Sequence, residues 1–332
     1  MKTIAKFLFY QILCPLLVFC NADRLLRIRS TRRRLIIMYH GVSGKKNFSI
    51  NGRHLPAGEF EKHLKYFKQN FDVLPLKELC DMREHKNSKL AVAITFDDGY
   101  LNNIQHAIPL LLKYRIPATF FVSTISLTDS QYLHPADYID VIAKKKRGII
   151  DINGRKFPTG NRQLMSAKET VYTYINSLGF KDFKKVMDSL HRRYHLEEVV
   201  TDIDADVYKL VGKETFSEFL CDSLFSMGSH GHDHINLNML SQEELADQLA
   251  ASKRILESHT KGTVNALAFP YGYFNEDVVK SAAEQGYRYM LAGGSVGDEW
   301  RQQVFPRIGI LNMAGYAFNM LSISRGFRHF GF

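Results

Sequence analysis

The chain has 332 residues, of which 45% are hydrophobic, so it is long enough for one large α/β domain or two small ones. Its four cysteines, Cys14, Cys20, Cys80 and Cys221, form no CxxC pair, which argues against a disulfide framework or a thiolate metal site. The net charge is +10, but residues 1–34 alone hold eight lysines and arginines against one aspartate. Because the basic charge is concentrated at the N-terminus, we expect no nucleic-acid partner.

The N-terminal segment, residues 1–34, combines an apolar run from Ile4 to Phe19 with a cluster of arginines behind it. This composition favours an interfacial anchor on an anionic membrane, and the positive-inside tendency then favours the cytoplasmic face. The run is about 16 residues long, which is short for a spanning helix that usually needs ~20. Three alternatives remain: a signal-anchor, an ordinary soluble helix, and a signal peptide cleaved near Ala22. Cleavage of a signal peptide would give a periplasmic or secreted protein.

Apolar runs alternate with amphipathic stretches in the rest of the chain, a pattern typical of parallel βα units. The predicted strands are 35–40, 90–96, 117–122, 224–228, 264–269, 287–292 and 304–310. The predicted helices are 59–69, 76–83, 100–114, 241–258 and 275–285. This alternation stops between residues 123 and 222, where Asn153–Gly154 predicts a hairpin and polar helices are expected near 165–177 and 181–195.

Residues with metal-binding chemistry follow two of these predicted strands. Asp97 and Asp98 follow strand 90–96, whereas His230 and His234, four residues apart, follow strand 224–228. One aspartate and two histidines are a common ligand set for a divalent ion that keeps a position open for water, and the other aspartate can deprotonate that water. A helix N-cap at the aspartates and a polar helix face at the histidines are the structural alternatives. The combination predicts a metal-assisted hydrolase.

The sequence resembles the polysaccharide deacetylases, the carbohydrate esterases with a NodB homology domain. The resemblance rests on Thr95–Gly99, Ser229–His234 and Phe269–Gly272, and it covers roughly residues 35–123 and 223–312. It implies a distorted (β/α) barrel for residues 35–332, interrupted by an inserted α+β segment at about 123–222. It also implies metal-dependent deacetylation of a glycan.

The resemblance further implies roles for the residues of the first two motifs. Asp97 would be the catalytic base, and Asp98, His230 and His234 would hold a divalent metal ion. Zinc is the default for this ligand set, with cobalt, nickel, manganese or iron as alternatives.

Other residues are expected at the substrate. Pro270 and Tyr271 would bind it, and a backbone N–H there would stabilise the oxyanion. Trp300 is a candidate for stacking on a sugar ring. The insertion at 123–222 is expected to form part of the substrate-binding wall, because it leaves the barrel on the face that holds the metal ligands.

Two positions depart from the family pattern. The third motif often begins with an arginine that orients the base, but Ala268 stands there, and Arg307 is the candidate to replace that arginine in space. The last motif often ends with a histidine that acts as general acid, but Asn312 stands there, and His40 is the candidate to supply the proton. These departures leave a rival hypothesis, a glycan-binding protein on the same fold with weakened chemistry.

We therefore expect a metal-dependent carbohydrate deacetylase. Its substrate would carry N-acetyl or O-acetyl groups and would be a surface or capsular polysaccharide or its lipid-linked precursor. Tyr39–His40 resembles the branch of the family that acts on such polysaccharides. The expected partners are this acetylated glycan and, through residues 1–34, a membrane surface, and the sequence does not indicate an oligomeric state.

Overall fold

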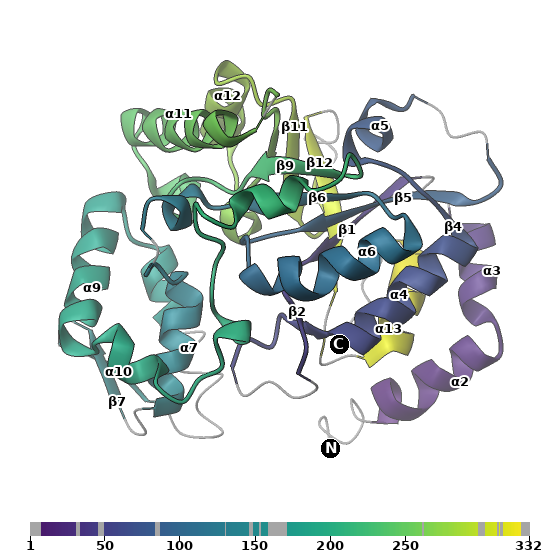
Figure 1. The fold of residues 1–332 in the computed structure, drawn as a ribbon, viewed down its shortest axis with the longest axis horizontal. Coiled ribbons are helices and arrows are strands. Elements are labelled where there is room, and N and C mark those ends of the chain that lie inside the picture. The colour runs from purple at the N-terminus through teal and green to yellow at the C-terminus, as the bar shows by residue number, and fades with distance from the viewer. Residues whose placement is uncertain are drawn as a thin grey trace.

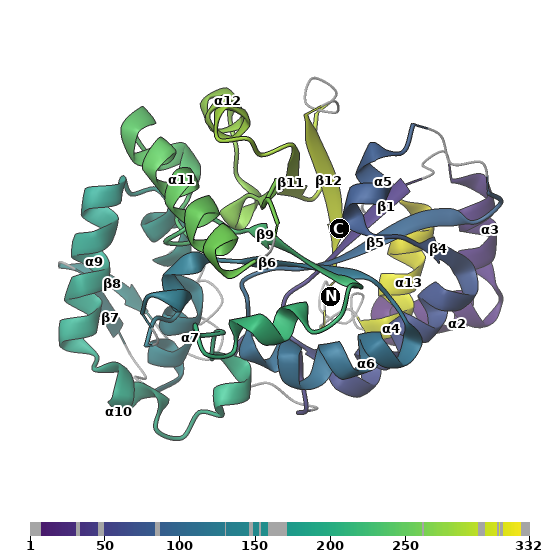
Figure 2. The same ribbon diagram turned by 45° about the horizontal axis from the view of Figure 1, so that its top comes forward.

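Seven parallel strands close into a barrel that is ringed by helices in this computed structural model (Figures 1 and 2). The structure describes residues 8–30, 34–45, 50–83, 87–129, 131–145, 149–152, 154–158, 171–260, 262–297, 303–310, 312 and 315–326. In order around the barrel the strands are β1 (Arg34–Tyr39), β12 (Val304–Gly309), β11 (Tyr289–Gly293), β10 (Ala266–Ala268), β9 (Phe225–Ser229), β6 (Ala118–Val122) and β5 (Leu90–Phe96). Pairing of β1 with both β12 and β5 closes the ring, so the expected barrel is confirmed.

The barrel strands are apolar on both faces, because the helices cover one side and the barrel interior covers the other. All seven residues of β5 are buried, as are all five of β6. This burial explains why continuous apolar runs identified the seven strands in the sequence. A short outer strand, β4 (Phe71–Val73), pairs with β5 outside the ring and was missed, because three residues carry too little pattern.

The helices expected around the barrel are present with shifted ends. They are α4 (Ala57–Asn70), α5 (Leu76–Asp81), α6 (Ile108–Tyr114), α11 (Gln242–His259) and α12 (Glu276–Glu284). The helix predicted over 100–114 is confirmed over residues 101–114, with a π-helical turn, η2 (Asn103–Ala107), inside it, whereas Tyr100 forms a bridge with Leu210. The start of α11 is fixed by a capping box between Ser241 and Glu244.

The insertion lies on one side of the barrel, with β7, α7, α9 and α10 grouped together in Figure 1. It contains η3 (Thr124–Leu127), α7 (Pro135–Lys145), the antiparallel hairpin of β7 (Ile149–Ile152) and β8 (Arg155–Pro158), a helical segment at 171–176, α9 (Phe180–Arg193), α10 (Leu196–Val200), η4 (Ala205–Val207) and η5 (Phe216–Leu220). The hairpin and the α9 helix agree with the sequence pattern, whereas α7 was missed. The insertion returns to the barrel where the Val211 N–H donates to the Gly99 carbonyl at 2.9 Å, beside the pair of aspartates.

Two N-terminal helices pack on the opposite side of the barrel from the insertion (Figures 1 and 2). A π-helical turn, η1 (Phe9–Leu13), leads into α2 (Cys14–Phe19) and α3 (Ala22–Arg29), which lie against the C-terminal helix α13 (Gly315–Arg325). No single helix in the described part of the chain is long and apolar enough to span a membrane. Phe9–Phe19 and Ala22–Arg29 pass that test only together, and they are bent by 76°.

Candidate active site

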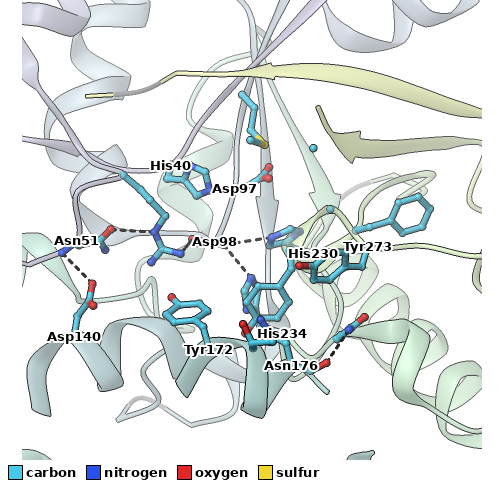
Figure 3. Close-up of a pocket in the computed structure, with 18 of the residues that line it drawn as sticks. His40, Asn51, Asp97, Asp98, Asp140, Tyr172, Asn176, His230, His234 and Tyr273 are labelled. Atoms are coloured by element: carbon cyan, nitrogen blue, oxygen red, sulfur yellow. Dashed lines mark hydrogen bonds and ion pairs between the residues drawn. The ribbon is translucent and has the colours of Figure 1, made fainter. Parts of the chain in front are cut away.

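Three buried side chains meet at the carboxyl ends of β5 and β9 and could hold a metal ion (Figure 3). Asp98 Oδ1 lies 3.3 Å from His230 Nε2 and 3.2 Å from His234 Nε2. Asp98 is the second residue after β5, and His230 directly follows β9, which lies two strands further round the barrel. Their ligand atoms lie within 4.8 Å of one another, close enough to share one ion.

The hydrogen bonds around this centre leave the metal-facing atoms available. His230 Nδ1 lies 2.8 Å from the Ala268 carbonyl, so the protonated Nδ1 donates there and Nε2 keeps its lone pair. Asp98 Oδ2 and His234 Nδ1 are buried without a hydrogen-bond partner among the described residues. The atoms that face one another, Asp98 Oδ1 and the Nε2 atoms of His230 and His234, form a donor set of one carboxylate and two imidazoles that fits a divalent cation.

Backbone strain is concentrated at the same place. Among the described residues other than glycine, six have positive φ, and four of these line one pocket: Asn51 at 55°, Asp98 at 74°, His234 at 49° and Tyr271 at 59°. Such conformations persist only where the surrounding structure enforces them, and they cluster at functional sites. The strain therefore marks this pocket as the site.

Asp97 is held by Arg307 of β12, which lies two strands from β5 round the barrel, with β1 between them. Arg307 Nη1 donates to Oδ1 of Asp97 at 2.6 Å and Nη2 donates to Oδ2 at 2.7 Å, while Nε donates to the Ala292 carbonyl at 3.2 Å. Burial of the carboxyl raises its pKa, but the charge and hydrogen bonds of Arg307 and the charge of His230 outweigh it, so the pKa of Asp97 is lowered. Arg307 therefore binds Asp97 as expected of the arginine that Ala268 replaces in the family pattern.

His40 follows β1 and lies beside Asp97 in the pocket (Figure 3). The Asn103 side chain donates to the His40 carbonyl at 2.8 Å, which fixes the backbone at this position. Burial lowers the pKa of His40 to about 4. The imidazole is therefore neutral at pH 7 and must gain a proton before it can donate one as an acid.

The turn after β10 presents Tyr271 to the pocket. Its ring packs against His234 with centroids 4.7 Å apart, and its positive φ turns the backbone sharply within η7 (Pro270–Gly272). A Cβ on Gly272 would come within 2.9 Å of the Gly293 nitrogen, so only glycine fits there. Pro270 is buried but does not line the pocket, which does not support its expected contact with substrate. The other expected substrate residue, Trp300, lies outside the described residues.

The cavity around these residues has a volume of about 940 Å³, which is enough for several sugar units. Three parts of the chain build its wall: the β1 to α4 segment, the turn after β10 and the insertion. The insertion contributes Asp140 from α7 and Tyr172, Thr173, Asn176 and Ser177 from the helical segment at 171–176 and its end. The insertion therefore faces Asp98, His230 and His234, on the side of the barrel that the sequence predicted.

An arginine that the sequence did not single out also enters the pocket. Arg53 lies just before the short strand β3 (Leu55–Pro56), which pairs with β2 (Val42–Ser43). Its Nη1 lies 3.7 Å from Asp98 Oδ2, and its Nη2 donates to Asp137 Oδ1 at 2.5 Å. Asp137 is fully buried on α7 and also accepts a hydrogen bond from Tyr100 at 2.6 Å. No local pattern could identify Arg53, because a lone arginine in a polar loop is ordinary.

Another histidine that the sequence did not single out, His134, contacts both Asp98 and His234. His134 Nε2 lies 3.1 Å from the Asp98 carbonyl, and its ring is 4.2 Å from the ring of His234. Burial lowers its pKa well below the usual range, so it is neutral. His134 precedes α7, a helix that the sequence pattern did not reveal, and was missed for that reason. His232, by contrast, bonds to Thr124 away from the ligands.

Comparison with known proteins agrees with this geometry. The sequence profile of the polysaccharide deacetylase family matches residues 84–149 and 203–290, on either side of most of the insertion. YxkH of Bacillus subtilis, a protein assigned to the polysaccharide deacetylases, is 25% identical over 256 residues, which are 76% of this chain and 62% of YxkH. The poly-beta-1,6-N-acetyl-D-glucosamine N-deacetylase of Staphylococcus epidermidis is 25% identical over 283 residues, which are 84% of this chain and 74% of that protein.

A solved structure shares the fold. IcaB from Ammonifex degensii aligns with a TM-score of 0.53 at 17% identity, covering 87% of this chain and 98% of that one. At this identity the likeness shows a common fold. The sequence profile, the relatives and the barrel with its Asp–Asp and His–His motifs agree, so the chain is similar to the polysaccharide deacetylases in sequence and in fold.

Proposed function

We propose that this chain is a metal-dependent carbohydrate deacetylase that removes N-acetyl groups from a polysaccharide. The observation that carries the proposal is the buried Arg307–Asp97 pair beside a complete set of metal ligands in one large pocket. A glycan-binding protein would have no need for a carboxylate held ionised next to three ligands. This geometry favours the enzyme over the rival binding protein.

Asp98, His230 and His234 would hold the ion, and the set of one carboxylate and two imidazoles suits zinc. When bound, the ion supplies Lewis-acid polarisation of the acetyl carbonyl and acidifies water. Asp97 accepts the proton of the attacking water, since Arg307 keeps it ionised and oriented. The Tyr271 backbone N–H stabilises the negative charge on the former carbonyl oxygen.

The reaction consumes one water and gives acetate and a free amine, so the nitrogen must gain a proton as the C–N bond breaks. We assign the return of this proton to His40. Because burial makes His40 neutral at pH 7, it receives a proton within the site before it donates one to the nitrogen. The proton removed by Asp97 is the available source.

The substrate proposal follows the relatives and the pocket. The Staphylococcus relative is named for N-deacetylation of poly-beta-1,6-N-acetyl-D-glucosamine, and we propose an N-acetylated surface or capsular polysaccharide, or its lipid-linked precursor, for this chain. The polar and aromatic lining, including Tyr172, Asn176 and Tyr273, suits a sugar chain.

Two neighbouring variants test the chemistry. Asp97→Asn removes the base and leaves the ligands, so we expect the metal to stay bound and turnover to fall by roughly 10²–10⁴. Asp98→Asn removes a ligand, so metal and turnover should be lost together. The readouts are metal content and acetate release from N-acetylglucosamine oligomers, with O-acetylated oligomers as the comparison. Full activity after exhaustive chelation would refute metal dependence, and loss of metal in Asp97→Asn would mean that the two aspartates have exchanged roles.

A further inference from the structure

The outer face of the N-terminal helices is the most apolar exposed surface in the described part of the chain. Ten large hydrophobic residues are exposed among all the described residues, and seven of them lie between residues 8 and 28. These seven, which we call the outer face, are Leu8, Ile12, Leu13, Leu16, Phe19, Leu25 and Ile28. Such a concentration of exposed apolar side chains on neighbouring helices points to an interaction site, whereas single scattered ones do not.

The helix α3 departs from an ordinary surface helix, because two charged residues point inward and two large apolar residues are exposed beside Arg24 and Arg29. Asp23 is buried and Arg27 is largely buried, whereas Leu25 and Ile28 on the opposite side of the helix are 57% and 70% exposed. An ordinary surface helix points its apolar stripe at the core and its charges at water. An outer side of this mixed apolar and basic composition fits the boundary between lipid headgroups and acyl chains.

The inward charges of α3 are tied into the barrel. Arg27 bonds to Asp23 at 2.5 Å and to the Asn70 side chain at 2.9 Å, and it also bonds to the Tyr66 hydroxyl. Tyr66 in turn lies 2.9 Å from the Ser324 hydroxyl of α13. These contacts fix the rotation of α3, so Leu25 and Ile28 cannot turn inward without breaking them.

The helix α2 likewise packs against α13 on one side and is exposed on the other. Cys14 is fully buried in a small apolar cluster with Ala317 and Leu321 of α13. Leu16 and Phe19 point away and are 54% and 84% exposed. The two helices are therefore part of the fold on one side and apolar on the other.

We propose that the outer face binds the interfacial region of an anionic lipid bilayer, with α2 and α3 lying on the membrane and not spanning it. The bend of 76° between the helices opposes a straight span. Arg24 and Arg29 are exposed on α3 beside Leu25 and Ile28, where they can reach anionic headgroups. A second copy of the chain is a poorer occupant, because two-fold pairing of the same surface would bring these cations together.

Vesicle flotation of the full-length protein tests this, independently of the proposed chemistry. Phe19→Ser/Leu25→Ser/Ile28→Ser should weaken binding to phosphatidylglycerol-containing vesicles by on the order of a hundredfold, since each apolar side chain contributes through its buried area. Leu25→Ser and Ile149→Ser form a matched pair, because both residues are 57% exposed but Ile149 lies on the β7 strand. Only Leu25→Ser should weaken binding.

The positive charge beside the outer face provides a second, independent test of membrane binding. Arg24→Gln/Arg29→Gln should weaken binding to these vesicles about thirtyfold at low salt and leave the weaker binding to pure phosphatidylcholine unchanged. Thermal unfolding of each variant shows that the fold is kept. Undiminished flotation of the folded triple variant would overturn the proposal. A wild-type dimer that the triple variant converts to monomer, with no vesicle binding by either protein, would instead assign the face to self-association.

Discussion

The Arg307–Asp97 pair joins residues 210 positions apart, and the proposed chemistry depends on it. In the sequence, Arg307 was only a candidate to replace the arginine that the family pattern has at the position of Ala268. The fold brings the guanidinium onto both carboxylate oxygens, because β12 and β5 both flank β1 in the closed barrel. Both side chains are almost completely buried, so each charge depends on the other.

Removal of Arg307 should change both the rate and its pH dependence. Asp97 acts as a base only when ionised, and Arg307 lowers its pKa, so the acid limb of kcat/KM lies below the pH at which free aspartate titrates. Arg307→Gln leaves burial to raise this pKa, so the acid limb should move to higher pH and the rate at pH 7 should fall by about 10². Arg307→Lys should not rescue it, because an ammonium cannot bind both oxygens. A pH–rate profile checks this, and an unmoved acid limb would contradict it.

The same variant should be less stable. A carboxyl whose pKa is lowered by folding stabilises the protein above its unfolded pKa, ~3.9, and this contribution is lost as the pH falls through the folded value. Loss of one partner of a buried pair costs about 3–5 kcal/mol at neutral pH. The wild-type contribution persists at pH 4, which lies above the folded pKa of Asp97. In Arg307→Gln burial raises this pKa, so the ionised carboxyl destabilises the variant at pH 7 and the penalty is relieved as it takes up a proton at lower pH. Urea unfolding should therefore show a larger difference between wild type and Arg307→Gln at pH 7 than at pH 4.

His40 offers a separate test of proton return. His40→Asn removes the ionisable ring but keeps a polar side chain, and we expect kcat to fall by about 10² while metal content and KM stay close to wild type. The effect should shrink with substrates whose leaving group needs no proton, such as an activated aryl acetate. An equal loss on both substrates would mean that His40 only shapes the pocket.

At the scale of single elements, the helical segment at 171–176 makes the insertion part of the binding wall. Tyr172 lines the pocket, and its ring lies 6.5 Å, edge to face, from the ring of Tyr271. Tyr172→Ala should raise KM for oligosaccharides about tenfold with little change in kcat, since a stacking side chain contributes mainly to binding. Tyr172→Phe keeps the ring and should be close to wild type. A loss of kcat without a change in KM would contradict this role.

The N-terminal helices also act as elements of the fold. Their contacts through Arg27 and Cys14 cover α13 and satisfy polar groups on α4. Residues 1–34 taken alone suggest a removable anchor, whereas α2 and α3 complete the packing on this side of the barrel.

At the scale of the whole molecule, truncation should therefore reduce stability. Deletion of residues 1–30 exposes the apolar side of α13 and leaves the buried Tyr66 hydroxyl without Arg27 and Asp23. We expect a loss of about 3 kcal/mol or more in the free energy of unfolding, measured in urea. Phe19→Ser in the full chain is the control and should leave stability nearly unchanged, because Phe19 is 84% exposed. A truncated protein as stable as the full chain would show that α2 and α3 add nothing to the fold.

The seven barrel strands, the order of the motifs and the candidate metal ligands could be predicted from the sequence. These features are local: each strand is an apolar run, and Asp98 and His230 lie within two residues of the end of a strand. Which distant side chains meet could be seen only in the folded chain. Closure of the barrel brings Arg307 to Asp97, a polar loop carries Arg53 to Asp98, and packing on α13 turns the apolar side of α3 outward. Such contacts depend on strand order and helix rotation, which residues far apart in the chain fix together and which no local window contains.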